Sequence, residues 1–170
     1  MKSLVIYFSR ADENYFGGQM RYIEKGNTEI AGEYIRDITG ADLFKVERKT
    51  PYAKDYMTCI EEAKEEQRRN ELPELKEYLD DISGYDVIFI GGPIYWGTLP
   101  QPMFTELTRL DFNGKTVMPF STHEGSGLGS IERDLKRVCV GAEIKSGLAI
   151  VGSRVNGSKS NIEKWIKENI

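Results

Sequence analysis

Apolar residues recur along the chain in short unbroken runs that are separated by longer amphipathic segments. Residues 4–8 and 86–90 form the two clearest runs, and residues 116–120 and 147–151 repeat the pattern. A continuous run rich in β-branched and aromatic residues is typical of a strand that is covered on both faces. Residues 43–46 alternate between apolar and charged positions, which predicts a strand at the edge of the sheet.

Helical patterns fill the spaces between these runs. In residues 28–39 the apolar side chains recur at helical spacing, and Gly40 follows as a stop signal. Residues 55–70 are heavily charged, which indicates a helix with a solvated face. Further helices are predicted from Pro100 onward, over residues 128–138 and over residues 159–170. Because strands and helices alternate, we expect one doubly wound α/β domain over residues 1–170, with a parallel sheet and helices on both faces.

The composition limits the class of protein. The chain has 170 residues, of which 39% are hydrophobic, so it can form the core of a folded domain. A net charge of −4 argues against a nucleic-acid binder, which normally carries a basic face. No apolar run approaches the ~20 residues that a membrane-spanning helix needs, and the first run is too short for the core of a signal peptide.

The cysteines and the single histidine offer little metal or disulfide chemistry. Cys59 and Cys139 lie far apart without a CxxC motif, so neither a disulfide framework nor a zinc site is expected. Two free thiols suit a reducing compartment, and we therefore expect a cytoplasmic protein.

The loops after the strands are the places to look for a ligand, because ligands of such sheets bind at the carboxyl ends of the strands. The first strand is followed by Ser9 and Arg10, and the next helix begins with Gly26, Asn27 and Thr28. A helix N-terminus offers free N–H groups to an anion, and glycine lets the backbone approach closely, so this loop favours a phosphate. The plainer interpretation is that Asn27 or Thr28 only caps the helix. No nucleoside-triphosphate loop and no dinucleotide fingerprint follows this strand.

An insert at residues 11–25 separates the two halves of this loop. Its Gly17-Gly18 pair lies between aromatic and aliphatic residues, which predicts a small hairpin. The hairpin could be a flap beside the phosphate site or a loop with no part in binding.

The second loop combines glycine with exposed aromatic residues. Tyr95 and Trp96 follow the most apolar strand, at the ligand-binding edge, where aromatic rings suit stacking on a flat ring system. Gly97 accepts either sign of φ, so the peptide beside it could turn over at little cost. The alternative is that both rings only pack against the core or the surface.

The third loop supplies hydroxyl and N–H groups that could hydrogen-bond the rim of a heterocycle. It contains Thr122, His123, Gly125 and Gly127. The glycine spacing imitates a dinucleotide fingerprint, but it follows a late strand and the match is weak. His123 alone cannot form a metal site, and we expect a passive loop residue rather than a proton donor.

In their order and spacing, these motifs resemble the flavodoxin-like family. The residues that carry the resemblance are Tyr7-Phe8-Ser9-Arg10, Gly26-Asn27-Thr28-Glu29, Gly92-Pro93-Ile94-Tyr95-Trp96-Gly97 and Gly125-Ser126-Gly127. The Glu13-Asn14-Tyr15 insert is similar to that of a bacterial subgroup of the family. The likeness covers essentially the whole chain, and it implies a five-stranded parallel sheet of order 2-1-3-4-5 that binds FMN.

The resemblance also implies a role for each motif. The phosphate would be held by Ser9, Arg10, Asn27 and Thr28, and Asn14 of the insert would be a further cofactor-binding residue. The isoalloxazine ring would be lined by Pro93, Ile94, Tyr95, Trp96 and Gly97, with Trp96 or Tyr95 stacked on it. Its pyrimidine side would contact Thr122, His123, Gly125 and Gly127.

Three departures from the family pattern are visible. Asp12 stands where many relatives have glycine, which adds an anion near the phosphate. The third loop has no aromatic residue, although many flavodoxins cover the ring with two. The long insertion that splits the last strand of long-chain flavodoxins is absent, because residues 144–151 leave no room for it.

The resemblance leaves two functions open. The first is a low-potential electron carrier, in which FMN supplies the redox chemistry and Glu124 and Asp12 disfavour the fully reduced, anionic flavin. The second is an NAD(P)H:quinone-type oxidoreductase, in which the uncovered ring face admits a substrate and His123 donates a proton. The expected partner is a redox protein or a small electron acceptor, with neither nucleic acid nor membrane involved. A signalling receiver domain is disfavoured, because the first strand ends without clustered acidic residues.

Overall fold

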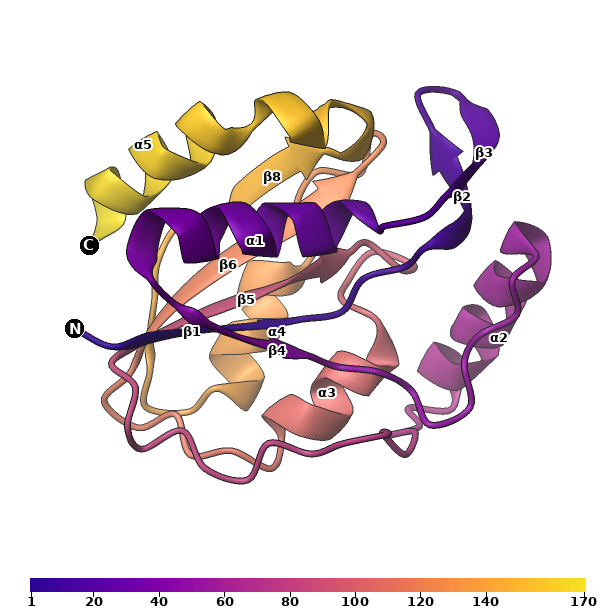
Figure 1. Cartoon of the computed structure of the whole chain (residues 1–170). Helices are drawn as coiled ribbons and strands as arrows, with labels where there is room; N and C mark the ends of the chain where they lie inside the picture. Colours follow the sequence, from indigo (N-terminus) through magenta and orange to yellow (C-terminus); the bar gives the residue numbers. More distant parts are fainter.

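The apolar runs form the strands of one parallel sheet in the computed structural model, which describes residues 1–170 (Figure 1). The strands are β1 (Ser3–Tyr7), β4 (Asp42–Lys45), β5 (Val87–Pro93), β6 (Thr116–His123), β7 (Glu143–Ile144) and β8 (Leu148–Val151). Their order is β4-β1-β5-β6-β7, and β8 also pairs with β6. The predicted order 2-1-3-4-5 is therefore confirmed, with β4 as the edge strand.

The fifth position of the sheet is filled by two short strands, whereas a single run was predicted there. Val117 of β6 pairs with Ile144 and Phe120 pairs with Leu148. The partner sequence therefore contains one residue more than β6 between these pairs, which is a bulge. Pro119 lies in this interval and has no N–H to donate to a neighbouring strand. No long insertion is present, but the strand is interrupted.

Helices cover both faces of the sheet (Figure 1). Their bounds are α1 (Asn27–Thr39), α2 (Tyr56–Arg68), α3 (Gln101–Leu107), α4 (Ile131–Val138) and α5 (Lys159–Asn169), with a 3₁₀ helix η1 (Gly152–Gly157) before α5. The side chains of α1 and α5 pack on one face, and those of α2, α3 and α4 on the other. Figure 1 shows α2 standing to one side, next to the β2–β3 hairpin.

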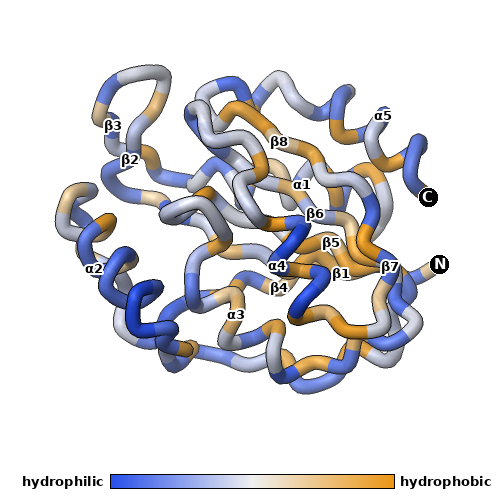
Figure 2. Tube along the Cα trace, turned by 180° about the vertical axis from the view of Figure 1, so that it is seen from behind, coloured by the Kyte–Doolittle hydropathy of each residue, from blue (hydrophilic) through white to orange (hydrophobic).

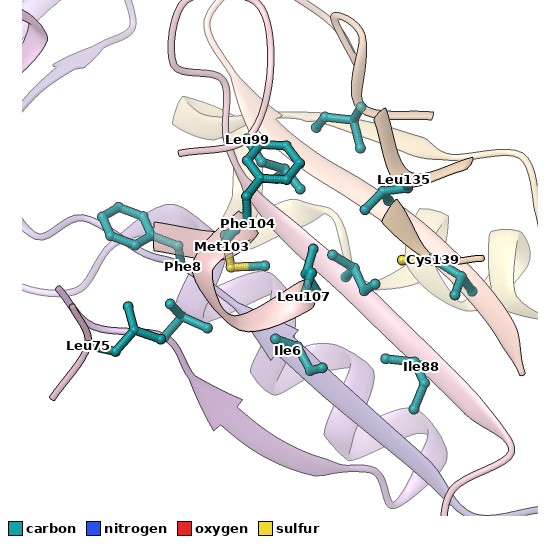
Figure 3. Close-up of a cluster of buried hydrophobic side chains, with 14 of the residues drawn as sticks. Ile6, Phe8, Leu75, Ile88, Leu99, Met103, Phe104, Leu107, Leu135 and Cys139 are labelled. Atoms are coloured by element: carbon teal, nitrogen blue, oxygen red, sulfur yellow. The ribbon is translucent and has the colours of Figure 1, made fainter. Parts of the chain in front are cut away.

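Two apolar clusters, one on each face of the sheet, form the core. Figure 3 shows the cluster beneath α3 and α4, where Ile6 and Ile88 of the sheet face Leu107. These three side chains are fully buried. Complete burial of such a side chain contributes about 1.5–3 kcal/mol relative to exposure. Figure 2 shows the hydrophobic residues gathered in the central strands, while much of α2 is hydrophilic.

The helix ends agree with the predicted signals except at α4. The Asp55 carboxylate accepts a hydrogen bond from the N–H of Thr58 at 2.9 Å and caps α2. Gly40 ends α1 in the left-handed region. Helix α4 begins at Ile131 and not at residue 128, since Gly129 has a φ of +53° and belongs to a turn. A Cβ at Gly129 would lie 2.2 Å from the carbonyl oxygen of Gly97, so the turn is packed tightly against the second loop.

The insert forms the predicted hairpin, from β2 (Asp12–Phe16) and β3 (Gln19–Ile23). Gly17 and Gly18 have φ values of +61° and +87°, the positive values that a two-residue hairpin turn needs. The hairpin forms a separate two-stranded sheet.

Neither a metal centre nor a disulfide is present among the described residues. No group of three His, Cys, Asp or Glu side chains could hold a metal ion, and Cys59 and Cys139 are free and buried. None of the helices has the length and hydropathy of a membrane crossing.

Candidate functional site

The three loops meet at the carboxyl edge of the sheet and enclose a cleft of about 440 Å³, which we call the main cleft. Its lining residues are Arg10, Asn14, Tyr15, Asn27, Thr28, Tyr56, Cys59, Ile60, Ala63, Pro93, Ile94, Tyr95, Trp96, Gly97, Thr122, His123, Glu124 and Ser126. Its volume lies within the range of about 300–1,000 Å³ that is usual for small-molecule sites.

One end of the main cleft is built to receive an anion. It lies at the N-terminus of α1, where the Ser9 hydroxyl accepts a hydrogen bond from the N–H of Glu29 at 3.0 Å. The N–H groups of Asn27 and Thr28 donate to no atom of the chain. Free N–H groups and the positive end of the helix dipole together favour a negative charge here.

Two glycines allow the backbone to close around this end. A Cβ at Gly26 would lie 2.1 Å from the Ser9 hydroxyl oxygen and 2.7 Å from the carbonyl oxygen of Arg10. A Cβ at Gly152 would lie 2.5 Å from Nδ2 of Asn27. The approach of backbone to backbone at Gly26 requires glycine, whereas at Gly152 the amide of Asn27 would have to move.

A buried hydroxyl pair joins the first and third loops. The Thr28 and Thr122 hydroxyl oxygens are 2.7 Å apart, and both residues are buried. Since each hydroxyl is both a donor and an acceptor, the pair satisfies itself and leaves further capacity toward the cleft.

Arg10 brings a positive charge to the main cleft. Its guanidinium donates to the carbonyl oxygens of Glu13 at 3.1 Å and Lys54 at 2.8 Å, and it forms no ion pair with a carboxylate. The remaining N–H groups are available to a ligand, because a guanidinium has five donors. Arg10 is thus held in place by neutral groups and keeps its charge uncompensated.

The other end of the cleft is formed by a tight turn at residues 95–98. Trp96 and Gly97 have φ values of +51° and +88°, and Tyr95 and Thr98 exchange two backbone hydrogen bonds. The Trp96 side chain is 45% exposed, and its Nε1 donates to the carbonyl oxygen of Ile60 at 2.7 Å. The Lys64 ammonium lies 5.0 Å from the centre of the indole ring. Apart from this cation, no charged group or aromatic ring stacks on the indole.

Tyr95 packs inward from the same turn. Its ring meets Phe8 and Tyr52 edge to face at centroid distances of 5.8 and 5.9 Å. Its hydroxyl lies 4.0 Å from the Cys59 sulfur, and burial raises the pKa of this hydroxyl well above its ordinary value. Of the two predicted stacking residues, Trp96 is therefore the one with an exposed ring, while the Tyr95 ring packs against Phe8 and Tyr52.

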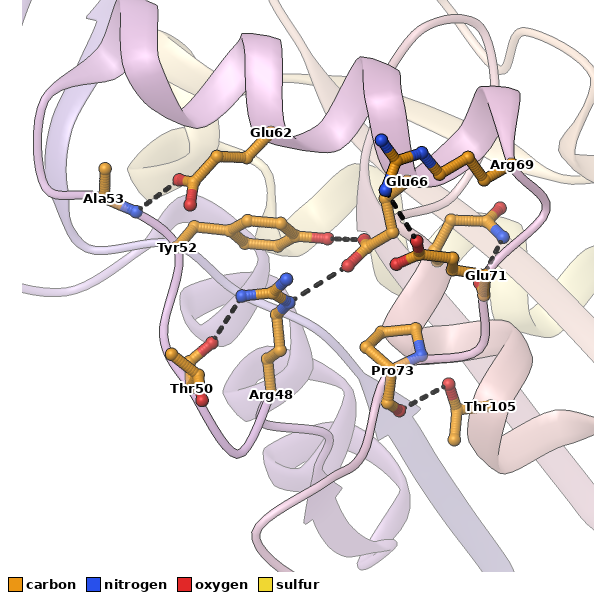
Figure 4. A network of polar contacts seen from close by, with 11 residues as sticks. Arg48, Thr50, Tyr52, Ala53, Glu62, Glu66, Arg69, Glu71, Pro73 and Thr105 are labelled. Atoms are coloured by element: carbon orange, nitrogen blue, oxygen red, sulfur yellow. Dashed lines mark hydrogen bonds and ion pairs between the residues drawn. The ribbon is translucent and has the colours of Figure 1, made fainter.

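A polar network joins the C-terminal half of α2 to the segment that follows β4 (Figure 4). The Glu66 carboxylate accepts hydrogen bonds from Tyr52 and from Arg48, whose Nε lies 3.0 Å from it. Glu66 is 3% exposed, and its burial raises the pKa of the carboxyl group despite these donors. Because removal of either partner would leave a buried carboxylate short of hydrogen bonds, the network holds α2 in a fixed position.

Helix α2 forms a wall of the main cleft that the charge pattern did not predict. Tyr56, Cys59, Ile60 and Ala63 line the cleft, while Glu65 pairs with Arg68 and Arg69 at the surface. The prediction of a solvated face holds for one side of the helix only. The spacing i, i+3, i+4, i+7 of the four lining residues was the available signal.

The hairpin lies beside this wall and is attached to it. Tyr15 lines the cleft, and its ring centre is 6.5 Å from that of Tyr56. The N–H of Tyr56 donates to the Glu13 carboxylate at 2.9 Å. Asn14 also lines the cleft, but its amide donates to the carbonyl oxygen of Arg10 at 3.0 Å and thus stabilises the loop itself. Tyr15 and Tyr56 supply aromatic surface that the third loop lacks.

The third loop contributes an imidazole and a carboxylate to the main cleft. His123 lines the cleft and its Nδ1 accepts a hydrogen bond from the N–H of Gly125 at 2.9 Å. The Glu124 carboxylate also lines the cleft and accepts a hydrogen bond from the N–H of Ser153 at 2.9 Å. Asp12 does not line the cleft. Its carboxylate accepts a hydrogen bond from the hydroxyl of Tyr22 at 3.0 Å.

Most of the residues singled out from the sequence thus meet in one cleft. Ser9, Gly125 and Gly127 do not line it. Ser9 acts from behind through its hydrogen bond to α1, and the carbonyl oxygen of Gly127 accepts a hydrogen bond from Ser121 at 2.7 Å. The arrangement offers donors and a positive charge at one end and flat apolar surface at the other.

Comparisons with known proteins agree with this fold. Residues 20–169 match the family model described as Flavodoxin. No curated protein matches the chain. A provisionally assigned flavoprotein from Bacteroides uniformis ATCC 8492 has a similar solved structure, with 25% identity and a TM-score of 0.75, over 98% of this chain and 97% of that one.

Two further solved structures share the fold at lower identity. A flavoprotein in complex with FMN from Lactobacillus acidophilus NCFM has 21% identity and a TM-score of 0.63, over 92% of this chain and 97% of that one. Oxidised flavodoxin 2 from Bacillus cereus has 18% identity and a TM-score of 0.57, over 99% of both chains.

Proposed function

This chain belongs to the flavodoxin family, and we propose that it binds FMN in the main cleft and serves as a low-potential electron carrier. The observation that carries the proposal is the pairing of an anion site at the N-terminus of α1 with an exposed Trp96 at the other end of the same cleft. The solved complex of the Lactobacillus acidophilus flavoprotein with FMN supports the choice of ligand.

The residues present fit FMN at both ends. The phosphate would bind the free N–H groups of Asn27 and Thr28, with the uncompensated charge of Arg10 beside it. The missing Cβ at Gly26 lets the Ser9 hydroxyl and the backbone of Arg10 lie directly against the start of α1, which brings the first loop to the phosphate end of the cleft. The flat ring would lie against Trp96 and the apolar side of α2, which adjoin each other in the lining of the cleft.

When bound, FMN supplies the redox chemistry, and the chain holds the ring and sets its surroundings. Tyr56, Cys59 and Ile60 exclude water from the wall of α2. Glu124 places a carboxylate at the cleft, which disfavours additional negative charge on a ligand there. Both effects favour the oxidised ligand over a reduced, anionic one and support a low potential.

The first test is the binding of FMN by the purified chain. We expect a yellow protein that binds FMN at a ratio of one to one and binds riboflavin at least about 100-fold more weakly, because two charge-assisted hydrogen bonds to the phosphate are worth about 3 kcal/mol. Fluorescence titration measures both affinities. A colourless chain that fails to quench micromolar FMN would show the proposal to be wrong.

One observation favours the oxidoreductase alternative. His123 lines the cleft, and with Nδ1 engaged its Nε2 remains able to exchange a proton with a substrate. Steady-state oxidation of NADH or NADPH, with quinones as acceptors, separates the two functions. A carrier shows negligible turnover. Turnover that falls in His123→Ala while FMN stays bound would instead establish the enzyme.

A further inference from the structure

In the turn at residues 95–98, the carbonyl oxygens of Tyr95, Trp96 and Gly97 all accept hydrogen bonds from residues that lie outside the main cleft. The Gln67 amide, from α2, donates to the carbonyl oxygens of Tyr95 at 3.3 Å and Trp96 at 3.2 Å. The carbonyl oxygen of Gly97 accepts from the N–H of Ser130 at 2.7 Å and from its hydroxyl at 3.1 Å. Gln67 and Ser130 do not line the main cleft, but they line a second cavity of about 380 Å³, which shares Trp96 with it.

The opposite side of the turn carries only donors. In a trans peptide the N–H points away from the C=O, and the chain has no cis peptide. Since the carbonyl oxygen of Trp96 faces Gln67, the N–H of Gly97 faces away from Gln67. The N–H groups of Trp96 and Gly97 donate to no atom of the chain, and both residues line the main cleft.

We propose that Gln67 is a positioning residue that holds this turn with its N–H groups available to the cleft and its carbonyl oxygens withheld from it. This inference rests on the proposed function. An edge of a ligand that meets the turn must then carry acceptors. The flavin nitrogen N5 would be such an acceptor in the oxidised ring, whereas reduction adds hydrogen to N5 and turns it into a donor. The hydrogen bonds from Gln67 therefore favour the oxidised form of the bound flavin.

The geometry of α2 supports a specific role for Gln67. Ile60, Lys64 and Gln67 follow one another at helical spacing, and all three contact the turn or its indole ring. Gln67 is the only one of them whose side chain binds the turn's backbone. Its loss would free the carbonyl oxygen of Trp96, which could then rotate toward the cleft at little cost because the next residue is Gly97, while that of Tyr95 would keep its bond from the N–H of Thr98.

The test compares two glutamine-to-methionine variants of the FMN-loaded protein. Gln67→Met removes the donor and keeps the length of the side chain. Gln101→Met is the matched control, since Gln101 lines the same second cavity but donates to the carbonyl oxygen of Glu71. Redox titration with dithionite measures the midpoint potential, and fluorescence titration measures FMN affinity.

We expect Gln67→Met to lower the preference for oxidised over reduced FMN about tenfold, which raises a one-electron potential by about 59 mV. Gln101→Met should leave the potential unchanged. An unchanged potential in Gln67→Met with FMN bound, or an equal shift in both variants, would overturn the inference. If Gln67→Met fails to fold, Gln67→Leu replaces it, because its side chain also cannot donate and adds no charge, and the same shift is required. Failure of the unaltered chain to bind FMN would overturn the proposed function as well, which separates the two outcomes.

Discussion

Single residues at this site act mainly by leaving hydrogen-bond donors and a positive charge available to a ligand. Gly26 lets the Ser9 hydroxyl and the Arg10 carbonyl oxygen lie against the start of α1, and Arg10 forms no ion pair because carbonyl oxygens, not carboxylates, accept its hydrogen bonds. Their effect lies in the donors that they make available to a ligand.

Gly26→Ala should weaken FMN binding strongly and destabilise the fold by about 1–3 kcal/mol, because the new methyl group would overlap the Ser9 hydroxyl and the Arg10 carbonyl. Fluorescence titration and urea unfolding measure the two effects. Gly84→Ala is the control, since nothing lies within 4 Å of its Cβ position. Equal FMN affinity in Gly26→Ala and the unaltered chain would contradict this account of the anion site.

Asp134 should give the stability of the protein a dependence on acid pH. Although burial opposes its ionisation, hydrogen bonds from Thr98 at 2.6 Å and Ser130 at 2.7 Å, with two nearby arginines, lower the pKa of its carboxyl group. A carboxyl group with a lowered folded-state pKa contributes stability above its unfolded value of about 3.9, and this contribution is lost as the pH falls through the lower folded value.

We therefore expect Asp134→Asn to destabilise the protein by about 1.5 kcal/mol at pH 7, with a difference that shrinks below about pH 4. Urea unfolding from pH 7 to pH 3 measures it. Glu77→Gln serves as the reference, because Glu77 is exposed and forms neither an ion pair nor a hydrogen bond. A difference that stays constant over this range would be inconsistent with the role of the charge.

At the scale of elements, two segments outside the sheet decide the shape of the cleft. Helix α2 supplies one wall and holds the Trp96 turn, while the β2–β3 hairpin adds Asn14 and Tyr15. A Cβ at Gly17, in the hairpin turn, would lie 3.7 Å from the Cβ of Ser153. The hairpin thus reaches from α2 to η1, and we infer that it slows the exchange of a bound ligand.

Replacement of residues 12–23 by a short Gly-Ser linker should speed FMN release about tenfold or more, which corresponds to about 1.4 kcal/mol. The main sheet should still fold, because the hairpin is a separate sheet. Stopped-flow fluorescence follows the release. Tyr22→Ala, which changes an exposed hairpin residue outside the cleft, should leave the rate unaltered. A truncated protein with the original release rate would show that the hairpin has no part in retention.

At the scale of the whole molecule, ligand binding and folding are coupled. The cleft draws residues from the loops after β1, β5 and β6 and from α1 and α2, which are far apart in the sequence, so it exists only in the folded chain. A ligand that binds only the folded state stabilises it in proportion to the logarithm of its concentration.

FMN at 100 times its Kd should raise the free energy of unfolding by about 2.7 kcal/mol, and Tm by roughly 5–10 °C for a chain of this size. Riboflavin at the same concentration should raise Tm far less, because it lacks the phosphate that the N-terminus of α1 would bind. Differential scanning fluorimetry measures both. Equal Tm shifts with the two compounds would show that the phosphate group does not contribute to binding.

The sequence by itself determined the alternation of strands and helices, the hairpin and the three loops, because each depends on local patterns such as apolar runs, glycine pairs and helix starts. The strand order came from the resemblance to the flavodoxin-like family, since no local pattern says which strands are neighbours. It did not determine the break in the last strand, which depends on which distant segment lies opposite Pro119 of β6, or the wall formed by α2. The charges of α2 predicted its outer side, but which partner its apolar residues face is set by long-range packing. Likewise only the tertiary structure brought Gln67 to the carbonyl oxygens of Trp96 and Tyr95. Contacts between residues far apart in the chain leave no periodic signal, and the fine shape of the cleft consists of such contacts.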